Sequence, residues 1–203
     1  GSITGTQGMI RDITTRKVAE EALIEREESL EEAQEFAKIG SWEMDTDTKK
    51  IVWSKQMYRM LEVSPDQEPT FELYFSRVHP DDLEYVQEVG ARVYENNEAA
   101  IAEYRLLTPS GIIMIVATSG HQILDVENNV IILKGIVQDI TERKQAEKEL
   151  EIQKAYLEEL FESAPEAIVI LDNEDRIERV NREFTNLFGY LPSEAIDKKI
   201  NDL

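Results

Sequence analysis

The chain has 203 residues, room for one or two domains, and it is 41% hydrophobic and 32% charged, the balance of a globular protein. Its 42 acidic and 22 basic residues give a formal charge of −20, which argues against partners that need a basic face, namely nucleic acid and anionic membranes. The absence of cysteine excludes disulfides, thiolate metal sites and cysteinyl cofactor adducts.

No apolar run reaches the roughly 18 residues of a membrane span. We therefore expect a cytoplasmic location without direct membrane contact, and a membrane tether elsewhere in a longer parent protein stays compatible with this. Many of the acids lie in two linker segments, where we interpret them as a solvated helix face and not as a metal site.

The first predicted elements are a strand over residues 3–13 and a linker helix over 15–37. Residues 1–14 would be the last strand of a preceding domain. The sequence of residues 10–23 recurs at 137–150, with eight of fourteen positions identical at an offset of 127. A repeat at this spacing indicates a tandem array, in which each copy ends one domain and begins a helix that leads to the next.

Each copy of the repeat carries candidate helix caps. Asp139 and Thr141, like Asp12 and Thr14 before them, have side-chain oxygens that can accept hydrogen bonds from the free amides of a first helical turn. Glu142 follows, where an acid suits the positive end of a helix. The same cap is therefore expected at two domain exits.

The two linker helices, over 15–37 and 142–164, also share an apolar register with alternating spacings of four and three residues. This register is typical of the seam of a short two-stranded coiled coil. Each copy has one polar seam residue, so a single amphipathic helix lying on its own domain is the alternative. We favour a parallel dimer because both copies keep the register. The predicted seam includes Ala19, Leu23, Leu30, Ala146, Leu150, Leu157 and Leu160.

Residues 38–141, between the linkers, are predicted to form one complete domain. Ser54 and Thr70 are candidate caps of short helices, and Pro80 suits a first helical turn. The predicted elements in chain order are strands over 40–45 and 51–53, helices over 55–61, 71–78 and 80–94, and strands over 99–108, 112–126 and 130–138.

Two of these strands do not alternate between apolar and polar residues: residues 112–117 and 130–133 are apolar throughout. Strands that are apolar on both faces are covered on both faces. One face would be the domain core, and the other must meet a linker helix, a partner subunit or both. This supports dimerisation or helix docking through the outer face of the sheet.

After the second linker helix, residues 165–203 repeat the beginning of a domain. Residues 164–172 parallel 37–45, and 181–188 parallel 54–61, at the same offset of 127. We read 165–203 as the N-terminal part of a following domain. Its strands, within 166–180, are expected to pair with residues 3–13, within or between chains, because both would otherwise present open sheet edges.

The central domain contains a set of recognisable motifs: Gly40-Ser-Trp-Glu-x-Asp45, Trp53-Ser54, Val78-His-Pro-Asp-Asp82, Tyr104-Arg105, Ser110-Gly111 and Gly135-x-x-x-Asp-Ile-Thr-Glu-Arg-Lys144. These motifs resemble those of the PAS family, which are sensory modules of bacterial and archaeal signalling proteins. The resemblance implies an α+β fold with a five-stranded antiparallel sheet of order 2-1-5-4-3, helices on one face, a pocket between them and, here, long flanking linker helices. The His-Pro-Asp-Asp loop is similar to that of a subfamily found in tandem in sensor kinases and cyclic-dinucleotide enzymes.

The chain departs from the family pattern in the strand after Gly111. That strand often carries Arg-Trp in the family, whereas this chain has Met114-Ile115. The strand is therefore more apolar than usual, and its usual packing partner is in doubt.

The same resemblance guides the choice of cofactor. A haem-binding PAS domain usually presents its ligand on the long helix, and residues 83–94 contain no histidine, so we expect no haem. His79 is interpreted as a structural turn residue and His121 as a surface or core residue. Covalent flavin is excluded because there is no cysteine, and a non-covalent ligand stays open. Candidate pocket residues, which could equally be plain core, are Trp42, Trp53, Tyr58, Phe71 and Phe75.

No catalytic constellation is visible, because two histidines and no glycine-rich phosphate loop leave little for nucleophilic or phosphoryl chemistry. The leading hypothesis is a relay module of a sensor histidine kinase or diguanylate cyclase, acting as a homodimer with neighbouring PAS and output domains. A small-ligand sensor, a structural spacer and an enzyme are the alternatives. The residues assigned to signal relay are Asp12, Thr14, Asp139, Ile140, Thr141 and Arg143.

Overall fold

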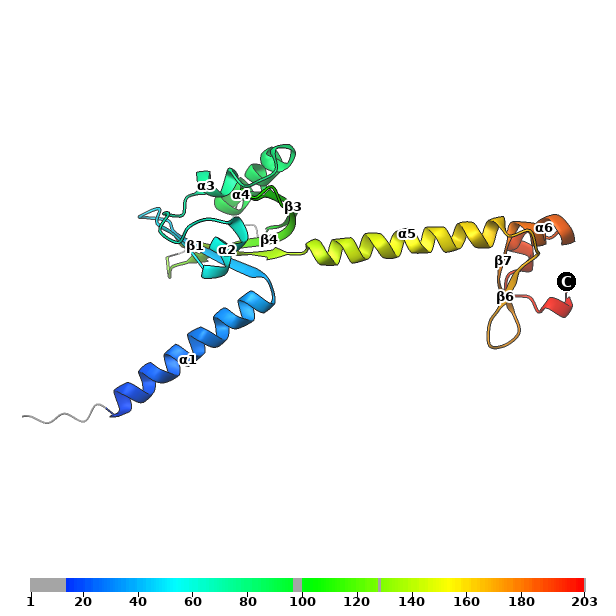
Figure 1. The fold of residues 1–203 in the computed structure, drawn as a ribbon, viewed down its shortest axis with the longest axis horizontal. Helices are drawn as coiled ribbons and strands as arrows, with labels where there is room; N and C mark the ends of the chain where they lie inside the picture. The colour runs from blue at the N-terminus through cyan, green and yellow to red at the C-terminus, as the bar shows by residue number, and fades with distance from the viewer. Residues whose placement is uncertain (1–13, 97–99, 128, 203) are drawn as a thin grey trace, which may run out of the picture. The chain divides into compact units, whose positions relative to one another are not determined.

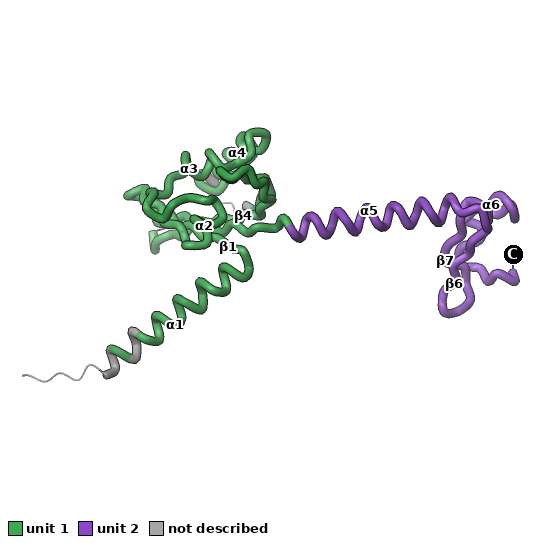
Figure 2. Tube along the Cα trace, in the orientation of Figure 1, with its two compact units in different colours: residues 1–141 green, residues 142–203 purple. Residues whose placement is uncertain are grey.

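The structure is a computed structural model that describes residues 14–96, 100–127 and 129–202. It divides into two compact units, residues 1–141 and 142–203 (Figure 2). The strand predicted over residues 3–13, its pairing with 166–180 and the side chain of Asp12 lie outside the described residues.

The first unit is built on one antiparallel sheet of five strands in the order β2-β1-β5-β4-β3. This confirms the predicted sheet and strand order. Figure 1 labels three of these strands, β1, β3 and β4. The strands are β1 (Ile39–Asp45), β2 (Ile51–Trp53), β3 (Ala100–Leu107), β4 (Ile113–Leu124) and β5 (Val130–Asp139), and α1 (Thr14–Phe36) precedes them.

Short helices follow β2 and pack on the inner face of the sheet. They are α2 (Lys55–Leu61), α3 (Phe71–Phe75), the 3-10 turn η1 (Pro80–Asp82) and α4 (Leu83–Asn96). The predicted caps form: Ser54 Oγ accepts from the amide of Met57, and Thr70 Oγ1 accepts from that of Leu73. The prediction that the second short helix extends to Val78 was wrong, because Val78 forms a β-bridge with Leu106 of β3.

The core of this unit lies between α2, α4 and the sheet. A Cβ on Gly135 would stand 2.3 Å from the carbonyl oxygen of Ser119 and 2.9 Å from the ring of Trp42, so only glycine allows the tryptophan to lie across β5. The side chains with almost no exposure are those of Met57, Leu61, Leu106, Val116 and Val137.

The second unit begins like the first. Its elements are α5 (Thr141–Ser163), whose first residue belongs to the first unit, the paired strands β6 (Val169–Leu171) and β7 (Ile177–Val180), α6 (Arg182–Phe188), α7 (Pro192–Ala195) and η2 (Ile200–Asp202). A small core forms from Ile177, Val180, Phe184 and Ala195.

Candidate functional site

A cavity of about 370 Å³ lies between the helices and the inner face of the sheet in the first unit. Its walls come from α2, α3, α4 and all five strands. Gln87, Gly90 and Tyr94 line the cavity and are exposed, which places its mouth beside α4.

Four of the predicted pocket residues line this cavity: Trp42, Trp53, Phe71 and Phe75. The assignment of Tyr58 was wrong. Its ring packs edge-on against Trp53, with centroids 5.4 Å apart, because Met57, one residue earlier on α2, occupies the position that faces the cavity.

The polar part of the cavity wall was missed by the sequence analysis. The hydroxyl groups of Tyr74 and Tyr104, which both line the cavity, are hydrogen-bonded to each other. Burial raises the pKa of Tyr104 to about 12 and raises the pKa of Tyr74 well above its usual value, so both phenols stay neutral at physiological pH. These residues are 30 positions apart in the chain, and only the packing of α3 on β3 brings them together.

The described lining of the cavity contains no Asp, Glu, Lys, Arg or His. In the part of the chain that the structure describes, no group of three or more His, Cys, Asp or Glu side chains could hold a metal ion. Nor does any described helix combine the length and hydropathy needed to cross a membrane.

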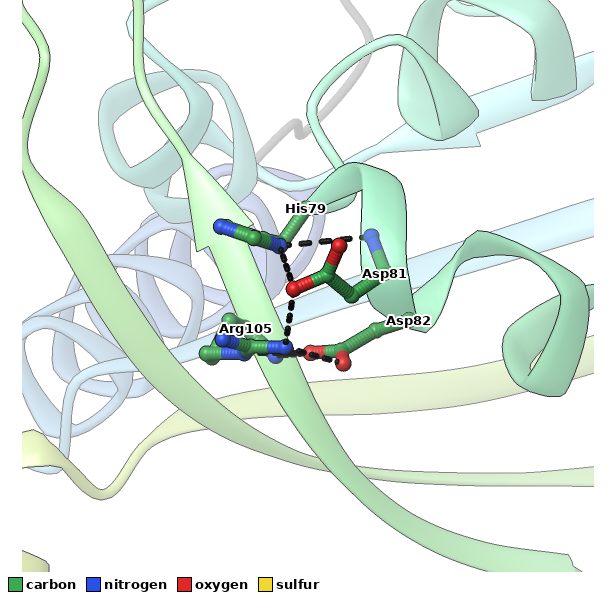
Figure 3. Close-up of polar contacts among 4 residues, drawn as sticks. All are labelled: His79, Asp81, Asp82 and Arg105. Carbon is green, nitrogen blue, oxygen red and sulfur yellow. Dashed lines mark hydrogen bonds and ion pairs between the residues drawn. The ribbon is translucent and has the colours of Figure 1, made fainter.

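The His-Pro-Asp-Asp loop is fastened to β3 by Arg105 (Figure 3). Asp82 accepts from Arg105 at Nε (2.9 Å), Nη2 (2.7 Å) and the backbone amide (2.8 Å). Hydrogen bonds from this guanidinium hold the pKa of Asp82 at about 2. His79 lies at the start of the turn, where its Nδ1 accepts from the amide of Asp81 at 3.3 Å. Asp82 is therefore an ion-pair partner as well as a charge at the helix start.

The joint between the sheet and the linker helix α5 is a cluster of hydrogen bonds at the end of β5, called the Thr141 knot below. The carboxylate of Asp139 accepts from the amide of Thr141 at 2.9 Å, as predicted for a helix start. Thr141 itself does something different: its Oγ1 accepts from the amide of Ile115 in β4 at 2.9 Å. Ile140 is buried, and its amide donates to the carbonyl of Ile115 at 2.9 Å.

The same knot holds the end of the preceding helix. The amide of Asp139 donates to the carbonyl of Lys38 at 3.0 Å, and Gln138 Nε2 donates to that of Ala37 at 3.4 Å. The guanidinium of Arg143, the remaining residue assigned to signal relay, lies 3.7 Å from the carboxylate of Glu147 on its own helix.

Two family models match the chain: the PAS fold over residues 50–137 and the PAS domain over residues 155–203. This chain belongs to the PAS family.

Known relatives include sensory and signalling proteins. The chain is 28% identical over 165 residues to sensor protein FixL of Bradyrhizobium diazoefficiens, covering 81% of this chain and 33% of FixL. It is also 28% identical over 187 residues to the probable diguanylate cyclase DgcE of Escherichia coli, covering 92% of this chain and 17% of DgcE. The chain thus spans about a third or less of the length of these relatives.

The solved structure of an RNA-binding light-oxygen-voltage receptor resembles this chain with a TM-score of 0.50 and 14% sequence identity. The match covers 82% of this chain and 76% of that one. At this identity the likeness shows a shared fold.

The two PAS regions share one hydrogen-bond arrangement at equivalent positions, called the latch below: a side-chain oxygen accepts from two backbone amides, one on a strand and one in the first turn of a helix. Ser54 Oγ accepts from the amide of Ser41 at 3.0 Å as well as from that of Met57 at 3.3 Å. In the second region Asn181 Oδ1 accepts from the corresponding amides of Ile168 (2.8 Å) and Phe184 (3.0 Å).

Asn181 makes two further bonds that a serine could not. It is 1% exposed, and its Nδ2 donates to the carbonyls of Phe161, at the end of α5, and Glu166. Asn181 therefore ties the linker helix to the PAS region that follows it.

Acids at equivalent positions of the two linker helices also contact the following PAS region. Glu31 pairs with Lys55 at 2.8 Å, and Glu35 pairs with Arg59 at 2.6 Å. Both acids stay largely exposed to solvent while they make these ion pairs.

Their counterparts in the second linker helix are Glu158 and Glu162. One nitrogen of Arg179, Nη2, donates to both carboxylate oxygens of Glu158, at 2.6 and 2.7 Å, and the guanidinium of Arg179 also lies over the ring of Phe161. Glu162 accepts from the amide of Arg182 at 3.1 Å.

The predicted seam residues do not pack against their own PAS region. Leu23, Leu30, Leu150, Leu157 and Leu160 are 48–64% exposed, Ala146 is exposed, and α5 has no buried residue. The side chain of Ala19 and that of Thr14, at the start of α1, lie outside the described residues.

The outer face of the sheet carries a row of isoleucines. Ile113 of β4 is 50% exposed and Ile136 of β5 is 41% exposed, while Ile115, Ile123 and Ile132 beside them are partly exposed. Within the described chain, this face is less completely covered than the predicted two-sided burial requires.

Proposed function

We propose that this chain is a sensory and relay module of a multidomain signal-transduction protein, such as a sensor histidine kinase or a diguanylate cyclase. Its PAS family and its similarity to FixL and DgcE support this assignment. The observation that carries the relay is the bond between Thr141 Oγ1 and the amide of Ile115. It attaches the first residue of the linker helix α5 to strand β4 of the PAS sheet.

The relay would work through two competing arrangements of this knot. A small shift of β4 against β5 changes the geometry of the Thr141 and Ile140 bonds to Ile115, and with it the start of the linker helix. Two arrangements that differ by only a few kcal/mol suffice for a signal to change their populations. Because Lys38 binds Asp139, the end of the preceding helix is coupled to the same point.

The active form is proposed to be a homodimer through the linker helices and the outer sheet face. Supporting this, exposed leucines lie at coiled-coil spacing on both helices, and isoleucines are exposed on the sheet. Further partners would be neighbouring PAS and output domains of the same protein, and we propose no nucleic-acid partner.

A second candidate is favoured by the cavity: the central PAS domain binds a small, non-covalent ligand. A volume of about 370 Å³ lies within the usual range of small-molecule sites, and the aromatic lining is typical of them. The cavity therefore favours a ligand-binding sensor domain over a relay domain without a ligand. In both versions the signal would leave the domain through the Thr141 knot.

The relay is tested in the full-length parent protein with the pair Thr141→Val and Thr141→Ser. Valine removes the oxygen that accepts from Ile115, whereas serine retains it. We expect Thr141→Val to abolish the response of output activity to the stimulus or to change the basal output activity. Thr141→Ser should behave like the wild type. Unchanged output and stimulus response in the valine variant would exclude this route.

The dimer is tested by oxidative crosslinking, which is clean because the chain has no native cysteine. Leu157→Cys lies on the predicted seam, and Ala155→Cys lies on the opposite side of the same helix. We expect rapid disulfide formation between chains for Leu157→Cys alone. Equal crosslinking of both variants would contradict the seam.

A further inference from the structure

The two linker helices are fastened in different ways to the PAS regions that follow them. The end of α5 is held by Asn181, which is 1% exposed and whose Nδ2 donates to the carbonyl of Phe161 on that helix. Ser54 stands at the equivalent position of the central domain, 127 residues earlier. Within the described residues, Ser54 binds only Ser41 and the first turn of α2. The end of α1 therefore lacks the bond that holds α5.

Helix α1 buries almost nothing against the central domain. Of its described side chains, at residue 17 and over residues 21–36, only that of Gln34 is partly buried, and all the others are exposed. Phe36, the last residue of the helix, is 93% exposed. Most of the stability of a helix in a protein comes from the packing of an apolar face, so α1 gains little from this source within one chain.

Two exposed ion pairs hold α1 against α2. Glu31 pairs with Lys55 at 2.8 Å and Glu35 pairs with Arg59 at 2.6 Å, and the four side chains are 48–70% exposed. Ion pairs that are this exposed contribute little, because water and salt screen them. A groove of about 200 Å³ remains between the two helices, lined by charged and amide side chains, so their packing is loose.

A buried oxygen at the same contact opposes docking. Gln56 lines the groove together with Lys55 and Arg59, its neighbours on the side of α2 that faces α1. Its Oε1 is buried and has no hydrogen-bond partner in the part of the chain that the structure describes. A buried acceptor without a partner costs free energy, which is recovered when water reaches it. Separation of the two helices would hydrate this oxygen.

We propose that α1 is a releasable strap: it alternates between the docked position on α2 and a released position in which Gln56 is hydrated. The docked position combines two weak ion pairs with one unpaired buried oxygen, so the two positions are close in free energy and both are populated. Helix α1 leads into Lys38, whose carbonyl accepts from the amide of Asp139 in the Thr141 knot. Release of α1 therefore acts beside that knot, although the strap itself does not depend on the proposed relay.

Substitutions of Gln56 test the strap. Gln56→Met keeps the length of the side chain and removes its hydrogen-bonding groups, so the docked position no longer contains an unpaired oxygen. We expect amide exchange over residues 28–36, measured by hydrogen-exchange mass spectrometry on the whole chain, to slow about fivefold or more, the effect of one unsatisfied acceptor. Gln56→Leu should act in the same direction, and both residues suit a helix. Gln67→Met, at an exposed loop position of the same domain, is the matched control and should leave α1 unchanged.

Two outcomes overturn the strap. Unchanged or faster exchange of α1 in both Gln56 variants would show that the buried oxygen does not oppose docking. Slowing that is equal in α1, α4 and the sheet would show a general stabilisation of the domain and not a tighter docking of α1. The Thr141 variants test the relay separately, so failure of the strap and failure of the relay are distinguishable.

Discussion

Asp82 holds the guanidinium of Arg105 through both carboxylate oxygens, at 2.9 Å and 2.7 Å, and also accepts from the backbone amide of Arg105. The pair joins η1, the turn directly before α4, to β3. Asp81, its neighbour, reaches the same guanidinium only at 3.4 Å and is mostly exposed.

The ion pair predicts a pH dependence of stability. Hydrogen bonds from Arg105 lower the pKa of Asp82 from 3.8 to about 2 in the folded protein. The stabilisation is therefore complete above pH 4 and is lost as the pH falls through 2. Asp82→Asn should lower the melting temperature at pH 7 and flatten its fall between pH 4 and 2, measured by thermal unfolding. Asp81→Asn is the matched control, and an equal effect of both would contradict the assignment.

A second prediction concerns the latch at the start of α2. Ser54→Ala removes the acceptor of two amides, those of Ser41 and Met57, and should lower the free energy of unfolding by about 1–2 kcal/mol, the upper half of the usual range for a helix cap. Urea unfolding measures this. Ser54→Asn installs the residue that the second PAS region uses at this position and should retain most of the stability. A loss as large as that of alanine would show that the two latches are not interchangeable.

Two glycine substitutions should have opposite signs. Gly135→Ala puts a methyl group 2.3 Å from a backbone oxygen of β4, so we expect a loss of about 3 kcal/mol through overpacking. Gly90 lies inside α4, where a new methyl group would meet nothing within 4 Å, and Gly90→Ala should stabilise the domain by about 0.5–1 kcal/mol. Chemical unfolding curves compare the two, and a stable Gly135→Ala chain would contradict the close approach of Trp42.

The acidic contacts of α1 predict a local change in helix protection. Replacing Glu31 and Glu35 together by glutamine removes the ion pairs with Lys55 and Arg59. Each exposed pair contributes at most about 1 kcal/mol, so the domain should stay folded while amide exchange quickens in the last turns of α1. Hydrogen-exchange mass spectrometry resolves this, with Glu27→Gln on the same helix as the control. Equal exchange in both variants would show that these pairs do not hold the helix.

Local chemistry explains what was predictable. The caps at Ser54 and Thr70 depend on residues three positions away, and the order of strands was implied by the resemblance of several motifs to a known family. The end of α3 was misplaced because Val78 forms a β-bridge with Leu106, a residue 28 positions further along, through hydrogen bonds of the residues on either side. Tyr58 was misassigned because alternate faces of a seven-residue helix cannot be told apart until the sheet beneath it is known.

The amino-acid sequence by itself determined the repeat and the helix starts, because both depend on residues close together in the chain, and its motifs implied the PAS fold through their resemblance to a known family. Only the tertiary structure decided that Tyr74 meets Tyr104, that Asp82 meets Arg105, and that Thr141 bonds to β4 and not to its own helix. These contacts join residues 23 to 30 positions apart on different elements, and several hydroxyls or charges in the sequence could have taken each place. Packing of the helices on one face of the sheet selects among them.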